Sequence, residues 1–148
     1  MAGTKYDAPD FMTRNLFNPF VALLTKMGLS MRGSRLLAVR GRKSGEWRTT
    51  PVNLLHYEGQ RYLVAPRGET QWVRNIRAAG GGELRLGSKK EEFRAAELSD
   101  AEKPDLIRAY LKLWKFETGK WFDGVTHESP DADVMRVAAD HPVFRVES

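Results

Sequence analysis

The chain has 148 residues, is 41% hydrophobic and contains no cysteine. It can therefore bury one core, but it cannot carry a disulfide framework, an iron–sulfur cluster, a thiolate zinc site or a cysteine nucleophile. The 24 Lys and Arg residues outnumber the 19 Asp and Glu residues, which gives a net charge of +5. This excess favours an anionic partner without indicating which one. We expect a single domain over residues 1–148.

The first predicted element is an amphipathic helix between Pro9 and Gly28. Apolar residues recur in it at helical spacing, Pro19 kinks or divides it, and Gly28 is a natural stop. Its charged and polar residues exclude a membrane span. Packing on the protein's own core is the favoured interpretation, and peripheral contact with a membrane surface is the alternative. Because no signal peptide is apparent, we expect a cytoplasmic protein.

The remaining predicted elements are five strand-like segments, three helices and a last strand. Strand-like segments occupy residues 35–40, 47–57, 61–66, 83–86 and 90–98, and a short helix at 70–79 ends at a run of three glycines. A capping box at residues 99–102 opens a further helix, another helix begins near Pro130, and residues 143–146 alternate like a last strand. Hairpin-linked strands without βαβ alternation predict an α+β fold, with about six mostly antiparallel strands in a sheet or small barrel and helices outside it.

The positive charge is concentrated in the middle of the chain. Residues 32–94 hold 14 basic and 6 acidic residues, a net charge of +8, while the rest of the chain carries −3. This distribution indicates a localised anion site. The alternative is that the arginines only decorate the solvent face of the strands.

Two motifs in this basic segment suggest the chemistry of such a site. A glycine-flanked turn contains Arg42, Lys43 and Ser44, with Arg48 on the outgoing strand, and such a turn suits phosphate or carboxylate. A second turn is formed by Ala65, Pro66, Arg67 and Gly68, and it leads into a helix that places Trp72 and Asn75 on one face. An aromatic plane beside an amide suits a flat heterocycle, although Trp72 could also be only a core residue.

Other common sites are absent from the sequence. The three histidines are isolated, so no metal site is expected, and no P-loop, dinucleotide-binding or nucleophile-elbow motif occurs. No catalytic residue can be assigned.

The run from Leu37 to Pro51, with Gly-Arg-Lys-Ser-Gly followed by Arg48, resembles the signature of the deazaflavin-dependent nitroreductase family. The likeness extends over roughly residues 36–108. Members are split β-barrel proteins that use coenzyme F420. The resemblance implies hydride transfer from C5 of the reduced deazaflavin to a quinone, a nitroaromatic or another activated small acceptor.

The resemblance also implies roles for individual residues. Arg42, Lys43, Ser44 and Arg48 would belong to the site that holds the phosphate and oligoglutamate tail. The deazaflavin itself would contact a second set, namely Thr50, Pro51, the turn from Ala65 through Pro66 and Arg67 to Gly68, Trp72 and Asn75. The family's tyrosine-rich loop is replaced by other aromatic residues, namely Trp114, Phe116, Trp121, Phe122 and His127.

Several alternatives remain open at this point. An FMN-binding split barrel would need fewer cations, and a protein that only sequesters F420 or a fatty acid would need no acceptor. A nucleic-acid module fits loosely with stacking aromatics on a basic face, but no nucleic-acid motif occurs, so none is expected as a partner. Either a monomer or a homodimer is compatible with the sequence.

Overall fold

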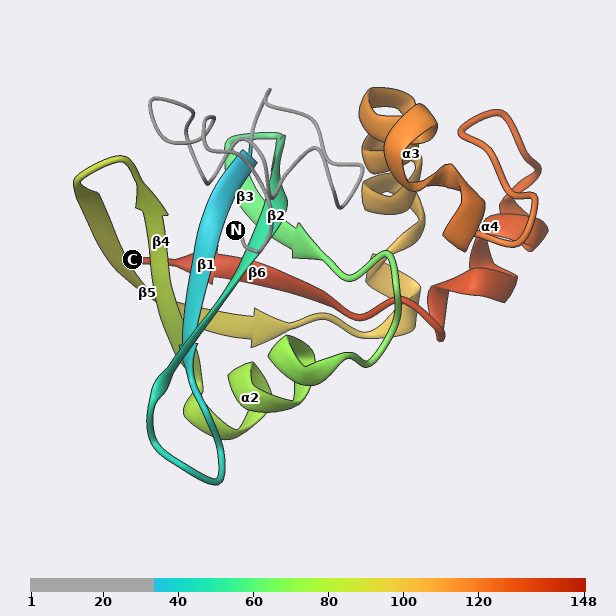
Figure 1. Ribbon diagram of the computed structural model, residues 1–148. Coiled ribbons are helices and arrows are strands. Elements are labelled where there is room, and N and C mark those ends of the chain that lie inside the picture. Colours follow the sequence, from blue (N-terminus) through green and yellow to red (C-terminus); the bar gives the residue numbers. More distant parts are fainter. Residues whose placement is uncertain (1–33) are drawn as a thin grey trace, which may run out of the picture.

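The structure is a computed structural model that describes residues 34–148, without the side chains of residues 115–118. The helix expected between Pro9 and Gly28 lies outside these residues. Six antiparallel strands form a closed barrel in the order β1-β2-β3-β6-β5-β4 (Figure 1). The strands are β1 (Ser34–Arg40), β2 (Trp47–Tyr57), β3 (Gln60–Val64), β4 (Gly81–Leu86), β5 (Lys89–Glu97) and β6 (Val143–Glu147). The predicted α+β class and barrel are confirmed.

Three hairpins and three longer-range pairings close the barrel. The hairpins β1–β2, β2–β3 and β4–β5 were all legible in the sequence, and Arg40 pairs with Trp47 at the start of the first one. The last strand, β6, inserts between β3 and β5, and β4 pairs with β1. Because these last pairings join distant segments, local sequence patterns do not specify them.

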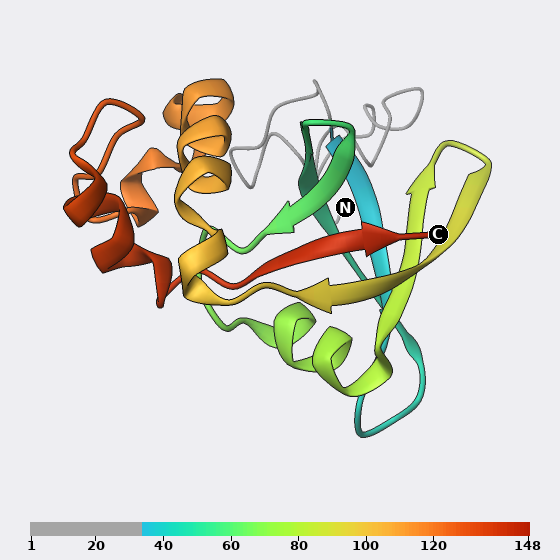
Figure 2. The same ribbon diagram turned by 180° about the vertical axis from the view of Figure 1, so that it is seen from behind.

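Helix α2 (Gln71–Ala79) covers one end of the barrel (Figure 2). Its apolar face carries Val73 and Ile76, which are fully buried and pack with Leu37, Phe93 and Phe144 in the barrel interior. The helix ends at Gly80, whose left-handed backbone conformation (φ 81°) satisfies a terminal carbonyl of the helix.

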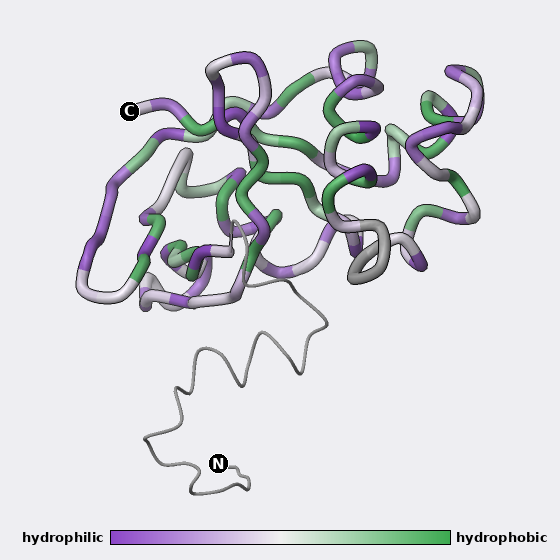
Figure 3. Tube along the Cα trace, turned by 90° about the horizontal axis from the view of Figure 1, so that it is seen from above, coloured by the Kyte–Doolittle hydropathy of each residue, from purple (hydrophilic) through white to green (hydrophobic). Residues whose placement is uncertain are grey.

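The other helices pack against the outside of the barrel. Helix α3 (Pro104–Thr118) and helix α4 (Asp131–Ala138) form a second core with Leu55 of β2 and Val143 of β6. Apolar residues gather along the strands and the inner face of α3 in Figure 3. None of the helices in residues 34–148 is long and apolar enough to cross a membrane.

Two predicted boundaries were wrong for identifiable reasons. Gly81 and Gly82 were expected to end a helix, but they begin β4, because their lack of a Cβ lets this strand approach backbone oxygens of Phe93 and Ala38. The capping box at Ser99 heads a short 3-10 turn, η1 (Asp100–Glu102), rather than the long helix. Helix α3 begins at Pro104 because proline suits the first helical position.

Candidate functional site

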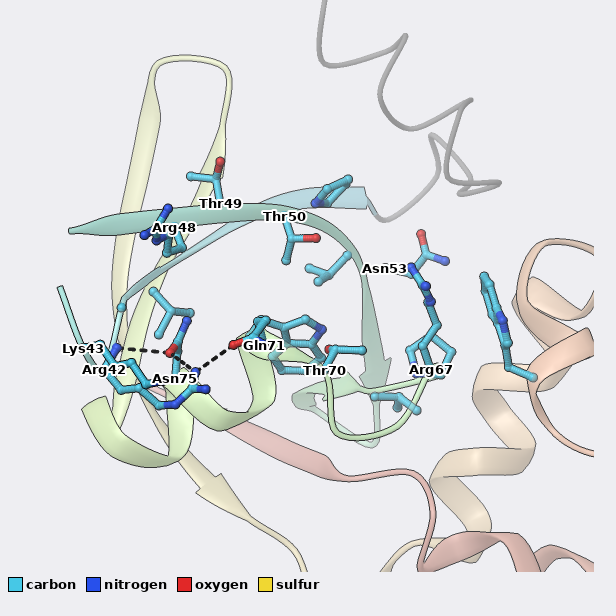
Figure 4. A pocket seen from close by; sticks show the side chains of 18 of the residues that line it. Arg42, Lys43, Arg48, Thr49, Thr50, Asn53, Arg67, Thr70, Gln71 and Asn75 are labelled. Atoms are coloured by element: carbon cyan, nitrogen blue, oxygen red, sulfur yellow. Dashed lines mark hydrogen bonds between the residues drawn. The ribbon is translucent and has the colours of Figure 1, made fainter. Parts of the chain in front are cut away.

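A pocket of about 690 Å³ lies between β2, the turn that joins β1 to β2, the turn after β3, and α2 (Figure 4). Ten of the twelve predicted site residues line it: Arg42, Lys43, Ser44, Arg48, Thr50, Pro51, Pro66, Arg67, Trp72 and Asn75. They come from segments separated by up to 33 residues. The fold therefore brings both predicted motifs to one cavity.

The turn at one end of the pocket is held by its own backbone. Gly41 N–H donates to Glu46 O at 2.7 Å, Gly45 N–H donates to Gly41 O at 2.9 Å, and Ser44 Oγ accepts from Glu46 N at 3.1 Å. A Cβ on Gly41 would stand 2.9 Å from Ser44 Oγ and 3.5 Å from Arg48 Nε. The glycine thus allows Arg48 to lie close against the turn.

Asn75 fastens this turn to helix α2. Its buried Oδ1 accepts hydrogen bonds from Arg42 N at 3.1 Å and from Arg42 Nη1 at 2.8 Å, and the same Nη1 donates to Gln71 Oε1 at 2.9 Å. These acceptors are neutral amides, so they orient the guanidinium without cancelling its charge. The predicted place of Asn75 beside a heterocycle does not include this supporting contact, because the contact joins residues far apart in the sequence.

Some cations of the +8 segment are paired with carboxylates and others are not. Within residues 34–148, three arginines of this segment pair with carboxylates: Arg61 with Glu91, Arg77 with Glu69 and Glu97, and Arg85 with Glu83. The Arg61 guanidinium lowers the pKa of the Glu91 carboxyl through its hydrogen bonds. In the same part of the chain, no salt bridge joins a carboxylate to the four pocket cations, Arg42, Lys43, Arg48 and Arg67. The pocket therefore gathers four cations that no carboxylate of residues 34–148 neutralises.

Between its two cationic ends, the pocket is lined by the uncharged residues Thr50, Pro51 and Trp72. Trp72 is half-buried, lines the pocket and packs against Phe144 with ring centroids 5.9 Å apart. Its core and ligand-facing interpretations are therefore compatible. Thr50 and Pro51 line the pocket from strand β2, so a flat ring could lie between this strand and the indole.

The opposite end of the pocket is formed by Arg67 together with aromatic residues from the outer helices. Figure 4 shows Arg42 and Lys43 at one end and Arg67 at the other. The Arg67 guanidinium lies 5.6 Å from the ring centroid of Trp121, which lines the pocket together with Tyr110. Tyr110 belongs to α3 and Trp121 to η2 (Gly119–Trp121), far along the chain from either motif. Local sequence patterns gave no indication that Tyr110 lines the pocket.

The other aromatic residues named in place of the tyrosine-rich loop behave differently. Trp114 and Phe122 are buried in the outer core, and His127 does not line the pocket. The side chain of Phe116 lies outside the described residues. Of this set only Trp121 has a described place in the pocket, because helix α3 kinks at Trp114 and redirects the chain that follows.

Two predicted site residues do not line the pocket, but they shape its wall. Ala65 O accepts a hydrogen bond from Gly68 N at 3.2 Å and lies 3.0 Å from Nδ1 of the buried His141. Gly68 has φ of +81°, and an added Cβ would lie 3.2 Å from Asp140 O. Ala65 and Gly68 thus hold the turn that carries Pro66 and Arg67 against the segment before β6.

Two buried polar atoms in the pocket wall have no hydrogen-bond partner among residues 34–148. These atoms are Asn53 Nδ2 on β2 and Thr70 Oγ1 at the start of α2. The Asn53 side-chain oxygen is satisfied, because Ser34 Oγ donates to it at 3.2 Å. Neither residue was predicted, since isolated polar residues in a strand and a turn give no sequence signal.

Comparisons with known proteins place the chain in a family. Residues 18–118 match the sequence model of the F420H2-dependent quinone reductases. No protein with a curated description matches significantly.

Solved structures share the fold at low sequence identity. An F420-H2 dependent reductase is 21% identical with a TM-score of 0.57, over 78% of this chain and 95% of that one. A structure described as a domain-swapped dimer is 19% identical with a TM-score of 0.56, over 95% of this chain and 100% of that one. A putative pyridoxamine 5'-phosphate oxidase from Listeria innocua is 12% identical with a TM-score of 0.50, over 89% and 92% of the two chains. These likenesses establish the split-barrel fold.

The predicted enzyme class and cofactor, an oxidoreductase that uses F420, are those of the matched family. The family description names a quinone where the sequence left a quinone or a nitroaromatic open. The features of the pocket fit this cofactor, since its polyanionic tail needs unpaired cations and its ring needs a flat, largely apolar slot. The match spans well over half of the sequence, and the chain therefore belongs to the F420H2-dependent quinone reductase family.

Proposed function

We propose that the pocket binds F420H2 with its tail at the Arg42 end and that the chain reduces a quinone-type acceptor at the Arg67 end. The single observation that carries this proposal is the set of four cations that line one cavity and have no salt bridge to a carboxylate of residues 34–148. The bound cofactor would supply the hydride from C5 of its deazaflavin. The protein's own contribution is binding, orientation and the electrostatic environment.

In this proposal Arg42, Lys43 and Arg48 hold the phosphate and oligoglutamate tail. All three side chains are exposed; Arg42 and Lys43 belong to a turn that is fixed by internal hydrogen bonds, and Arg48 lies at the start of the adjoining strand β2. Fixed donors bind anions with less loss of conformational entropy than flexible ones. The bonds from Arg42 to Asn75 and Gln71 support this assignment, because they orient a charged group that has no carboxylate partner in residues 34–148.

The deazaflavin would then lie along Thr50, Pro51 and Trp72. Stacking on the indole fixes the plane of the ring, and strand β2 limits how far the ring can move. The Ala65–Gly68 turn would close the slot on one side, with Arg67 directed toward the acceptor.

Fluorescence titration with purified F420 tests the central claim. We expect quenching that saturates at micromolar cofactor, followed by oxidation of F420H2 when a quinone such as menadione is added. The absence of any change in fluorescence at micromolar F420 would contradict the proposal.

A charge-reversal pair tests where the tail binds. The double variant Lys43→Glu/Arg48→Glu should weaken F420 binding by roughly 100-fold, because charge-assisted contacts with an anion typically contribute about 1.5–3 kcal/mol each. The matched control is Lys89→Glu/Lys90→Glu, which makes the same change in net charge at the exposed start of β5, away from the pocket. Equal affinities in the two double variants would show that the tail lies elsewhere.

A further inference from the structure

We propose that Asn53 determines acceptor specificity by donating a hydrogen bond from Nδ2 to a carbonyl oxygen of the quinone. This inference rests on the proposed function, because it assumes that the cofactor tail occupies the opposite end of the pocket. It adds one contact that neither of the two sequence motifs contains.

The first support is the state of the Asn53 side chain. The residue is 2% exposed, yet it lines the pocket, and its Nδ2 has no partner in the described part of the chain. Leaving a buried donor unsatisfied costs about 1–3 kcal/mol. A ligand that accepts from this N–H recovers that free energy, whereas a ligand without a suitable oxygen does not.

The second support is that the amide is held in place. Ser34 Oγ donates to Asn53 Oδ1 at 3.2 Å, and Ser34 is itself 2% exposed. The two residues face each other across the β1–β2 ladder, where Ser34 pairs with Asn53. Because one side of the amide is bonded within the barrel wall, its nitrogen is the donor that has no partner among residues 34–148.

The third support is the position of Asn53 in the pocket. Figure 4 shows Asn53 at the same end as Arg67, away from Arg42 and Lys43. Arg67 lies over Trp121, so this end offers a neutral donor, a cation and an aromatic plane. An electron-poor ring with carbonyl oxygens can use all three.

The chemistry of the reaction explains why a donor is useful at this place. One hydride and one proton pass from F420H2 to the quinone, which becomes a hydroquinone while the cofactor is oxidised to F420, so no further reductant is required. When the hydride arrives before the proton, negative charge develops on a quinone oxygen. A preorganised N–H and a nearby guanidinium stabilise this charge.

The test compares Asn53→Ala and Asn53→Asp with the parent protein and with Ser34→Ala. Both Asn53 variants remove the Nδ2 donor, whereas Ser34→Ala keeps the donor and removes only the hydrogen bond that orients the amide. For each protein we would measure the F420 dissociation constant, the circular dichroism spectrum, and kcat and KM with menadione. Phenazine methosulfate, which has no carbonyl oxygen, serves as the second acceptor.

We expect kcat/KM for menadione to fall at least tenfold in both Asn53 variants. The F420 dissociation constant and the rate with phenazine methosulfate should stay within about threefold of the parent values. In Ser34→Ala, kcat/KM for menadione should fall by less than in either Asn53 variant, because the donor remains but its orientation is no longer fixed. The F420 dissociation constant and the rate with phenazine methosulfate should again stay within about threefold. If one Asn53 variant fails to fold, as judged by circular dichroism, the other provides the same comparison.

Three outcomes would overturn the inference. Unchanged kcat/KM for menadione would remove any role in acceptor binding, and an equal loss with both acceptors would indicate a general structural effect. A weaker F420 complex with unchanged use of menadione would assign Asn53 to the cofactor instead. Failure of the parent protein to bind F420 would refute the proposed function rather than the role of Asn53.

Discussion

Two asparagines show how the surroundings of a residue decide its role. Asn75 and Asn53 are both buried and both line the pocket. Asn75 Oδ1 accepts two hydrogen bonds from Arg42, so this residue stabilises the cationic turn. Asn53 keeps one donor that has no partner among the described residues. The same side chain thus serves the scaffold at one position, whereas at the other we propose that it contacts a ligand.

His141 makes the stability of the protein depend on pH. The side chain is 5% exposed, lies stacked on Phe122 with ring centroids 4.1 Å apart and is 3.0 Å from Ala65 O. Burial lowers the pKa of His141 below its ordinary value of 6.5. The unfolded chain therefore binds a proton more readily than the folded one, and the free energy of unfolding should fall as the pH drops below about 6.5.

Urea denaturation at several pH values between about 7 and 5 would measure this effect. His141→Gln should flatten the dependence in that window, because glutamine does not titrate. The carboxyls with lowered pKa values, Glu91 and Glu102, lose their stabilising effect only below about pH 4.5, outside the window. An unchanged slope in His141→Gln would mean that another group is responsible.

At the scale of elements, the pocket exists because strand β2 and helix α2 are held at a fixed separation. Helix α2 is anchored to the barrel interior by Val73 and Ile76. It is followed at once by β4, which must pass close to both neighbouring strands. The glycines at the start of β4 make that passage possible.

We expect Gly82→Ala to destabilise the barrel by about 3 kcal/mol, at the upper end of the usual cost of overpacking. The added Cβ would lie 2.4 Å from Ala38 O, a backbone atom that can move only with strand β1. The control is Gly87→Ala in the β4–β5 turn, where the Cβ meets nothing within 4 Å and only the positive φ of 60° is unfavourable. That conformation costs about 1–2 kcal/mol. Equal urea midpoints for the two variants would show that β4 can shift freely.

At the scale of the whole molecule, the net charge of +5 includes a cluster of cations at the pocket that have no carboxylate partner in residues 34–148. By contrast, Arg61, Arg77 and Arg85 are paired with carboxylates outside the pocket. The local field of the pocket cations should therefore attract the anionic tail to the Arg42 end.

The affinity for F420 should consequently depend on ionic strength. Salt screens interactions between exposed charges, with a Debye length of about 10 Å at 0.1 M, so the dissociation constant should rise roughly tenfold between 50 and 500 mM NaCl. The variant Lys43→Glu/Arg48→Glu should show a much weaker dependence. Titrations that give the same affinity at both salt concentrations would argue for binding through the ring alone.

The sequence by itself determined the local elements and the chemical character of the site. Periodicity, turn residues and the capping box predicted the strands and helices, because these signals depend on neighbouring residues. The Gly-Arg-Lys-Ser-Gly turn with Arg48 indicated both the anion site and the family, since the charges and the flexible glycines lie within a few positions of one another.

The tertiary structure alone decided which of these residues share the cavity and which are already occupied. The closure of the barrel by β4 and β6, the pairing of Arg61 with Glu91, and the arrival of Tyr110 and Trp121 at the pocket all join segments far apart in sequence. The lack of a partner for Asn53 Nδ2 among residues 34–148 also depends on tertiary structure, because the groups around this side chain come from the neighbouring strand β1 and from the pocket. Burial and contacts between distant residues arise from packing in three dimensions, so local sequence patterns do not predict them.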